Sequence, residues 1–267
     1  MLRFISFGSG SSGNSYLLQN DNDMLVIDSG VGVRTLKKYY HDYGLTLAHI
    51  NNILITHDHA DHVKSVGAIS NAFNIPVFST SDVHKGIRKN YCVRKKIEPQ
   101  NEICIEKGKT YQIGSYKVTP FGVPHDSTDN VGYKIENSGI TFCLMTDIGH
   151  VTDEIRDNVA CADYLVIEAN HDEQMLKNGP YPQYLKERVA GENGHLSNKV
   201  CAETIAQYAS DKLKHVWLCH LSEENNHPEL LRKTIEDFLG QNGEKIGKRI
   251  KVDILKRKQP TGFFDLV

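Results

Sequence analysis

The chain has 267 residues, a formal net charge of −2 and 24% charged residues, which excludes a globally basic nucleic-acid-binding protein. Any nucleic-acid contact must therefore come from local basic patches. The six cysteines form no C-x-x-C pair, and we see neither a signal peptide nor a membrane-spanning stretch. These features favour a cytoplasmic protein with reduced thiols.

The first half of the chain is predicted to consist mainly of strands. Helical spacing occurs at 33–43 and 63–73, and the basic stretch 81–98 is predicted to be helical or irregular. Apolar or alternating runs predict strands at 2–8, 15–19, 23–30, 51–57, 76–80, 102–106, 110–123 and 131–147.

Strands alternate with helices in the second half. Helices are predicted at 172–189, 197–210 and 228–239. Strands are predicted at 162–170, 214–222, 248–255 and 263–267. Because no linker, repeat or low-complexity tract interrupts the pattern, we predict one α/β domain over residues 1–267, with sheets covered by helices.

A dense group of metal-ligand side chains follows the apolar strand at 51–57. The sequence T-H-D-H-A-D-H places His57, His59, Asp61 and His62 within six residues. Neutral imidazoles and carboxylates are ligands for first-row metals. One tetrahedral ion cannot easily use all four side chains from so short a loop, whereas two ions about 3.5–4 Å apart can. The alternative is a histidine-rich surface loop.

Three further polar residues stand at the ends of predicted apolar strands. His125 follows TPFGVP, Asp147 ends ITFCLMTD and His220 ends HVWLCH. Polar groups in such places must be hydrogen-bonded or metal-bound to be tolerated. We therefore predict that they complete a two-metal site.

The order of these motifs resembles the metallo-β-lactamase superfamily over nearly the whole chain. The resemblance implies a four-layer αββα sandwich, in which two mixed β-sheets are flanked by helices. It also implies that Asp28, at the end of LVID, orients the site from behind the ligands. The implied ligands are His57, His59 and His125 for the first ion, Asp61, His62 and His220 for the second, and Asp147 between both.

The resemblance further implies a hydrolase. Relatives that reduce oxygen at a di-iron site carry Glu at the position of His59. A hydroxide bridging two divalent ions would attack the substrate, with Asp61 or Asp147 steering the proton. Zinc and manganese are the ions we expect, and iron also suits these ligands.

Residues 190–201 suggest what the substrate is. Ser197 is predicted to cap the helix at 197–210, and His195 lies just before it, which together would form an anion site with a proton donor. The stretch is similar to the H-S/T stretch of tRNA 3′-processing endonucleases, although Leu196 interrupts it. The alternative for His195 is an ordinary capping or surface residue. Glu168 and His171 either line the site or shape a loop through hydrogen bonds.

Several motifs together resemble the YycJ (WalJ) family, a bacterial subgroup linked to DNA exonuclease activity. They are FGSGSSGNS, THDHADH, EANHD, GHLSN and CHLSEENN. Basic clusters at 88–96, around Tyr91, and at 256–258 could follow a nucleic-acid backbone, although solvated charged faces are the alternative. The interval between Asp147 and His220 is too short for the large cap domain of β-CASP nucleases.

Two other functions are compatible with the sequence. A small-molecule hydrolase acting on a thioester, lactone or cyclic phosphodiester would use the same fold. A non-catalytic metal-binding module is a third possibility, which the full ligand set disfavours. The sequence does not indicate an oligomeric state.

The stretch GSGSSG at 8–13 matches the dinucleotide-binding pattern G-x-G-x-x-G. That pattern requires a helix directly after it, whereas residues 15–30 predict a β-hairpin. We therefore expect neither a nicotinamide nor a flavin cofactor. The stretch is instead predicted to be a turn near the metal site, where Ser9, Ser11 and Ser12 could contact a substrate phosphate. A plain tight turn is the alternative.

Overall fold

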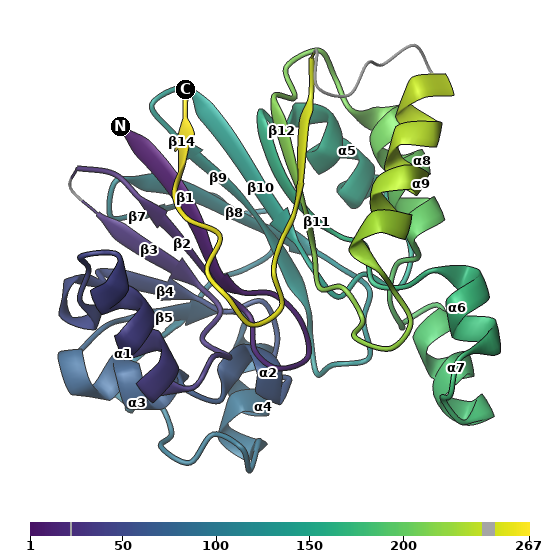
Figure 1. Cartoon of the computed structure of the whole chain (residues 1–267). Helices are drawn as coiled ribbons and strands as arrows, with labels where there is room; N and C mark the ends of the chain where they lie inside the picture. The colour runs from purple at the N-terminus through teal and green to yellow at the C-terminus, as the bar shows by residue number, and fades with distance from the viewer. Residues whose placement is uncertain (22, 242–248) are drawn as a thin grey trace.

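The computed structural model describes residues 1–21, 23–241 and 249–267, which form two β-sheets of seven strands each. Figure 1 shows the sheets between two groups of helices. In the first sheet the strands lie in the order β14 (Phe264–Leu266), β1 (Leu2–Gly8), β2 (Ser15–Gln19), β3 (Met24–Ile27), β4 (Asn52–Leu54), β5 (Val77–Ser79) and β6 (Glu102–Cys104).

The second sheet repeats this plan. Each sheet has an antiparallel part and a parallel part, since β3 to β6 are parallel in the first sheet and β10 to β13 in the second. The strands of the second sheet lie in the order β13 (Lys251–Ile254), β12 (His215–Cys219), β11 (Tyr164–Glu168), β10 (Ile140–Met145), β9 (Val131–Asn137), β8 (Tyr116–Gly122) and β7 (Tyr111–Ile113).

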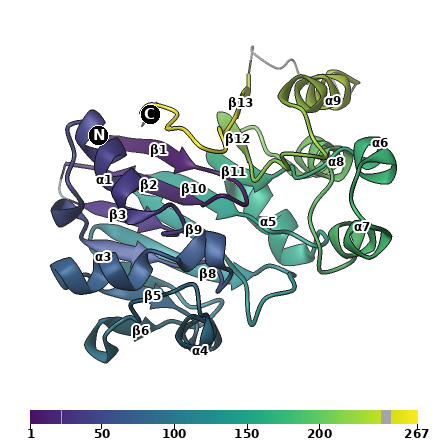
Figure 2. The same ribbon diagram turned by 60° about the horizontal axis from the view of Figure 1, so that its bottom comes forward.

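Helices cover the outer face of each sheet, as both views show (Figures 1 and 2). The first sheet carries α1 (Val33–Asp42), α2 (Ala60–Val63), α3 (Val66–Phe73) and α4 (Ser81–Lys89), with the 3₁₀ helices η1 (Leu47–His49) and η2 (Pro99–Asn101). The second half adds α5 (Asp153–Cys161), α6 (Glu173–Asn178), α7 (Gln183–Ala190), α8 (Asn198–Tyr208) and α9 (Pro228–Gln241).

Alternation along the strands builds three apolar layers. Between the sheets, Phe4 packs against Trp217 with ring centroids 4.6 Å apart. Ile5, the next residue of β1, points to the opposite face and packs in the layer of Leu36 and Tyr40 of α1. A third layer joins the second sheet to α5, α8 and α9. This arrangement confirms the predicted four-layer αββα sandwich.

The helical part of the second half differs from the prediction. The helix predicted over 172–189 is two helices, α6 and α7, because Pro180 and Pro182 cannot continue a helical hydrogen-bond ladder. Helix α5 was not predicted at all, although Thr152 caps it and Ile155 is buried on it. The basic stretch 81–98 is helical only as far as Lys89.

Two predicted segments include residues outside the described part: residue 22 in the hairpin expected over 15–30, and residue 248 in the strand expected over 248–255. None of the helices in the described ranges is long and apolar enough to cross a membrane. The organisation of residues 1–267 as one domain without a large cap stays a prediction.

Candidate metal centre

The candidate site lies where parallel strands of both sheets end, at the carboxyl edge where α/β sheets commonly place their ligands. Asp28, Asp147 and His220 follow β3, β10 and β12. All three adopt left-handed backbone conformations, with φ of 61°, 56° and 54°. Such conformations are uncommon outside glycine and cost about 1–3 kcal/mol each. Their gathering at one edge indicates a functional site.

His57, His59 and His125 form the first cluster of possible ligands, whose ring nitrogens lie within 4.8 Å of one another. His57 Nδ1 lies 3.0 Å from Thr56 Oγ1, and His125 Nδ1 lies 3.0 Å from the carbonyl oxygen of Gly194. The opposite nitrogens, Nε2 of His57 and Nε2 of His125, are buried and make no hydrogen bond. Burial also lowers the pKa of both rings, most strongly for His57, so that they stay neutral. This cluster is prepared to bind a cation.

Asp61, His62 and His220 form the second cluster. Asp61 Oδ2 lies 3.6 Å from His62 Nε2 and 3.4 Å from His220 Nε2. Behind each histidine stands a fully buried carboxylate: Asp28 lies 2.7 Å from His62 Nδ1, and Glu168 lies 3.0 Å from His220 Nδ1. These acids fix both rings so that Nε2 faces the centre of the site.

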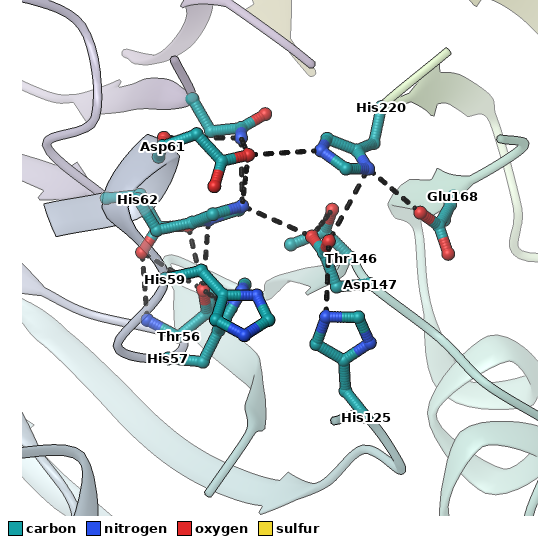
Figure 3. Close-up of polar contacts among 12 residues, drawn as sticks. Thr56, His57, His59, Asp61, His62, His125, Thr146, Asp147, Glu168 and His220 are labelled. Atoms are coloured by element: carbon teal, nitrogen blue, oxygen red, sulfur yellow. Dashed lines mark hydrogen bonds and ion pairs between the residues drawn. The ribbon is translucent and has the colours of Figure 1, made fainter. Parts of the chain in front are cut away.

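Asp147 lies between the two clusters (Figure 3). Its carboxylate is 3.2 Å from His62 Nε2, 3.5 Å from His220 Nδ1 and 3.7 Å from His125 Nε2. It is 2% exposed, so it contacts histidines of both clusters without competition from bulk water. This is the place that the sequence predicts for a carboxylate shared by two ions.

The ionised carboxylates of the site favour the binding of cations. Burial opposes the charged form of His62, but Asp28, Asp147 and Asp61 outweigh it and raise the pKa of His62 to about 10. Burial likewise opposes the ionised form of Asp147, but His220 and His62 hold its pKa well below 3.8. Carboxylates that stay ionised and imidazole nitrogens without a partner are the donor set of divalent first-row metals. The residues therefore fit two divalent ions.

Glu168 links the metal centre to His195. Its Oε1 lies 2.8 Å from His195 Nδ1, and its Oε2 accepts hydrogen bonds from the backbone N–H groups of Ile148 and Leu196. Burial raises the pKa of Glu168, but His195 and His220 outweigh that effect and lower it to about 2. Burial lowers the pKa of His195, but the Glu168 carboxylate outweighs it and raises this pKa above 6.5. The Glu168 carboxylate thus favours the protonated form of His195 beside the candidate ligands, where the His195 side chain is 19% exposed.

Ser197 and His171 lie next to each other behind His195, joined by a backbone bridge. Ser197 caps α8 as predicted, since its Oγ accepts a hydrogen bond from Val200 N. The same hydroxyl donates to Glu173 Oε1. His171 is 3% exposed, and its Nδ1 has no hydrogen-bond partner.

The three serines of the 8–13 turn have different surroundings. Ser9 is fully buried, and its Oγ lies 2.9 Å from the Tyr16 hydroxyl and accepts a hydrogen bond from His220 N. Its backbone N–H donates to Lys256 O. Ser9 therefore supports His220, while Ser11 and Ser12 are exposed at the tip of the turn.

Three asparagines support the site but were not among the predicted site residues. Asn130 donates to the carbonyl of Asp147 and Asn170 to that of His220, so each amide holds a left-handed residue in place. Asn14 Nδ2 lies 2.8 Å from His62 Nε2, directly at the centre. The available signal for Asn14 and Asn170 was their position in the motifs FGSGSSGNS and EANHD, whereas no such motif contains Asn130.

Comparisons with known proteins agree with this geometry. The family model of the β-lactamase superfamily domain matches residues 24–220. The chain is 29% identical to exodeoxyribonuclease YycJ of Bacillus anthracis, covering 97% of each chain. It is 32% identical to exodeoxyribonuclease WalJ of Streptococcus pneumoniae serotype 2 (strain D39 / NCTC 7466), covering 94% of this chain and 93% of that one.

A solved structure shares the fold over almost the full length. Zn²⁺-bound PqqB from Methylobacterium extorquens superposes with a TM-score of 0.72 at 15% identity, covering 99% of this chain and 100% of that one. The family match and the two sheets flanked by helices therefore lead to the same conclusion. The chain belongs to the metallo-β-lactamase superfamily of metal-dependent hydrolases.

Proposed function

We propose that this chain is a two-metal phosphodiesterase that shortens DNA as an exonuclease. The observation that carries the proposal is the coincidence of a full set of ligand side chains with relatives, matched over more than nine-tenths of the chain, that are named exodeoxyribonucleases. Zinc or manganese are the proposed ions, and iron also suits the ligands.

The proposed ligand roles follow the two clusters and the carboxylate between them. The orphaned Nε2 atoms of His57 and His125 support the first site, and the carboxylates behind His62 and His220 support the second. The proposed ligands are His57, His59 and His125 for one ion, Asp61, His62 and His220 for the other, and Asp147 for both.

The ions would stabilise negative charge on the phosphate and lower the pKa of a water molecule, which supplies the nucleophile. Asp61 and Asp147 hold ionised carboxylates at the centre, where either can accept that proton. His195, whose protonated form is favoured by Glu168, lies beside His125, with ring centroids 5.0 Å apart. From there it can neutralise the phosphate and donate a proton to the leaving oxygen.

The second candidate is a small-molecule hydrolase of the same fold, because the fold alone does not select the substrate.

One experiment distinguishes the two candidates. Purified protein is stripped with a chelator and reloaded with Zn²⁺ or Mn²⁺. It is then offered 5′-labelled single- and double-stranded DNA, bis-p-nitrophenyl phosphate and a glutathione thioester. Progressive shortening of DNA that is lost in His57→Ala supports the exonuclease. Thioester cleavage with intact DNA would instead establish the second candidate.

A further inference from the structure

A groove of about 490 Å³ opens beside the metal centre, within the size range of ligand pockets. His59 and Asp61 line its inner end, and Lys89, Tyr91 and Arg188 line the rest. Two candidate metal ligands thus share one cavity with two cationic side chains and an aromatic ring. A substrate bound at the metals would extend into this groove.

Tyr91 is the most exposed of the large hydrophobic residues that the structure describes, at 91%. The turn that carries it is nevertheless well fixed. Asn90 donates from Nδ2 to the carbonyl of Asp58 in the metal-binding loop, and its Oδ1 accepts from Cys92 N. Lys96 Nζ donates to Asn90 O. These bonds fix the backbone of the turn, from which Tyr91 projects into solvent at the pocket that His59 and Asp61 also line.

The loop after β4 also packs directly against α4, at Asp58 and Gly86. Asp58 accepts hydrogen bonds from the backbone N–H and hydroxyl of Thr128. A Cβ at Gly86 of α4 would lie only 2.0 Å from the Asp58 carboxylate. Asp58 thus packs against α4 at Gly86 and is hydrogen-bonded to Thr128, so the groove wall contacts the loop that carries His59 and Asp61.

The two cations of the groove differ in their partners. Within the described ranges, Lys89 forms no salt bridge, whereas its neighbour Arg88 is paired with Glu102. Arg188 is 56% exposed, but its Nε already pairs with the carboxylate of Asp126. Neutralising phosphates with such side chains releases counterions and gives affinity without sequence preference.

The basic cluster at 256–258 is less suited to binding a nucleotide. Lys258 is paired with Glu223, and Arg257 donates to the carbonyl of Ser222. The cavity beside them has no aromatic residue in its lining. Of these two basic clusters, the one at Lys89 combines cations with a ring on which a base can stack.

We propose that this groove binds an unpaired nucleotide of a single DNA strand next to the bond being cleaved. Tyr91 stacks on the base, and Lys89 and Arg188 contact the flanking phosphates. Stacking on a protein ring requires a base that is not already stacked inside a duplex, so the groove selects a single strand or a frayed end. This inference rests on the proposed function, since it names the form of DNA that the same site accepts.

The test is a binding titration that does not depend on turnover. Metal-loaded protein is titrated with a fluorescent oligothymidylate whose linkages are all phosphorothioate, and anisotropy gives Kd. We expect Tyr91→Ala to raise Kd by about 5- to 100-fold, from the usual strength of base–aromatic stacking. Tyr91→Phe keeps the ring and restores tight binding. Because Tyr91 is so exposed, its removal leaves the melting temperature unchanged, which excludes a folding defect.

The cations are tested by salt dependence. Lys89→Ala and Arg188→Ala each reduce the slope of log Kd against log salt by about one unit or less. Lys37→Ala, an exposed lysine on α1, is the matched control and leaves that slope unchanged. A blunt duplex of the same length is titrated in parallel and binds more weakly.

The results of these titrations distinguish failure of the groove assignment from failure of the proposed exonuclease function. If ordinary DNA is shortened but Tyr91→Ala binds the single strand as tightly as the parent protein, the groove assignment is wrong and the exonuclease stands. Equal loss of duplex and single-strand binding in Tyr91→Ala overturns the single-strand selectivity. If the parent protein neither binds nor shortens DNA, the proposed function itself fails, and the groove assignment fails with it.

Discussion

The carboxylate of Asp28 lies 2.7 Å from Nδ1 of His62, and both side chains are completely buried. The same carboxylate accepts hydrogen bonds from the backbone N–H and the hydroxyl of Thr56, whose Oγ1 is 3.0 Å from His57 Nδ1. One acid thus orients a histidine in each cluster, one directly and one through a hydroxyl. The contact leaves Nε2 of both rings directed at the centre.

Asp28→Asn is therefore expected to weaken metal binding, more at the second cluster than at the first. Loss of the carboxylate removes the partner that makes His62 a strong and well-oriented ligand, which typically costs about 10- to 100-fold in affinity. Metal content measured by mass spectrometry after dialysis against a weak chelator should fall from two ions toward one. Asp237→Asn, exposed on α9, is the control that keeps both. Unchanged affinity in Asp28→Asn would contradict this role.

Three of the candidate ligands, His57, Asp147 and His220, could be found from the sequence because each follows a mainly apolar run. The strands before His57 and Asp147 are largely buried, so a polar residue beyond their ends is expected at a sheet edge. The motif order then supplied the fold. The proximity of Asp28 to His62, by contrast, results from the pairing of β3 with β4. It could be inferred only from the resemblance to the metallo-β-lactamase superfamily.

The supporting residues could not be found in this way. Asn130 and Asn170 act on carbonyl groups, so their role depends on backbone conformations that no local pattern encodes. Ser9 lies in a turn that looks exposed in the sequence, yet the chain segment at 256–257 covers it. Helix α5 was missed because its apolar face is short, with Ile155 and Val159 packing against the second sheet and α8.

Removing the metals should destabilise the folded protein. Asp61, Asp147 and Glu168 all have pKa values below their usual range and remain ionised in the site. Bound ions stabilise the folded state by mass action, by about 4 kcal/mol when free metal exceeds Kd a thousandfold. We expect a lower melting temperature after chelation and recovery on adding Zn²⁺ or Mn²⁺, but not Mg²⁺, which favours oxygen ligands. Equal melting temperatures with and without chelator would argue against bound metals.

The cysteine pair outside the site gives a test of pH dependence. A hydrogen bond from Cys143 lowers the pKa of the half-buried Cys161 thiol from 9.0 to about 7. Because the thiolate is the reactive form, alkylation of Cys161 by iodoacetamide should rise with pH and level off above pH 7. In Cys143→Ala the plateau should move toward pH 9. The rate is measured by mass spectrometry of the Cys161 peptide, and a rate still rising through pH 9 in the parent protein would refute the shift.

The last prediction separates His195 from the metal ligands. Its Nδ1 lies 2.8 Å from Glu168 and 3.6 Å from Asp147, close enough to be either a ligand or a proton donor. The hydrogen bond to Glu168 occupies Nδ1, which leaves the other ring nitrogen for the substrate. His195→Ala should therefore keep both ions and slow cleavage of DNA by about a hundredfold to ten-thousandfold, the usual contribution of a general acid.

Glu168→Gln distinguishes the two roles further, because Glu168 contacts both His195 and His220. The change removes the negative charge that raises the pKa of His195, so the protonated form is lost at lower pH. The alkaline limb of the pH–rate profile should move toward lower pH, and some metal should be lost through His220. If His195→Ala itself loses one ion, His195 is a ligand, and the donor role passes to another group.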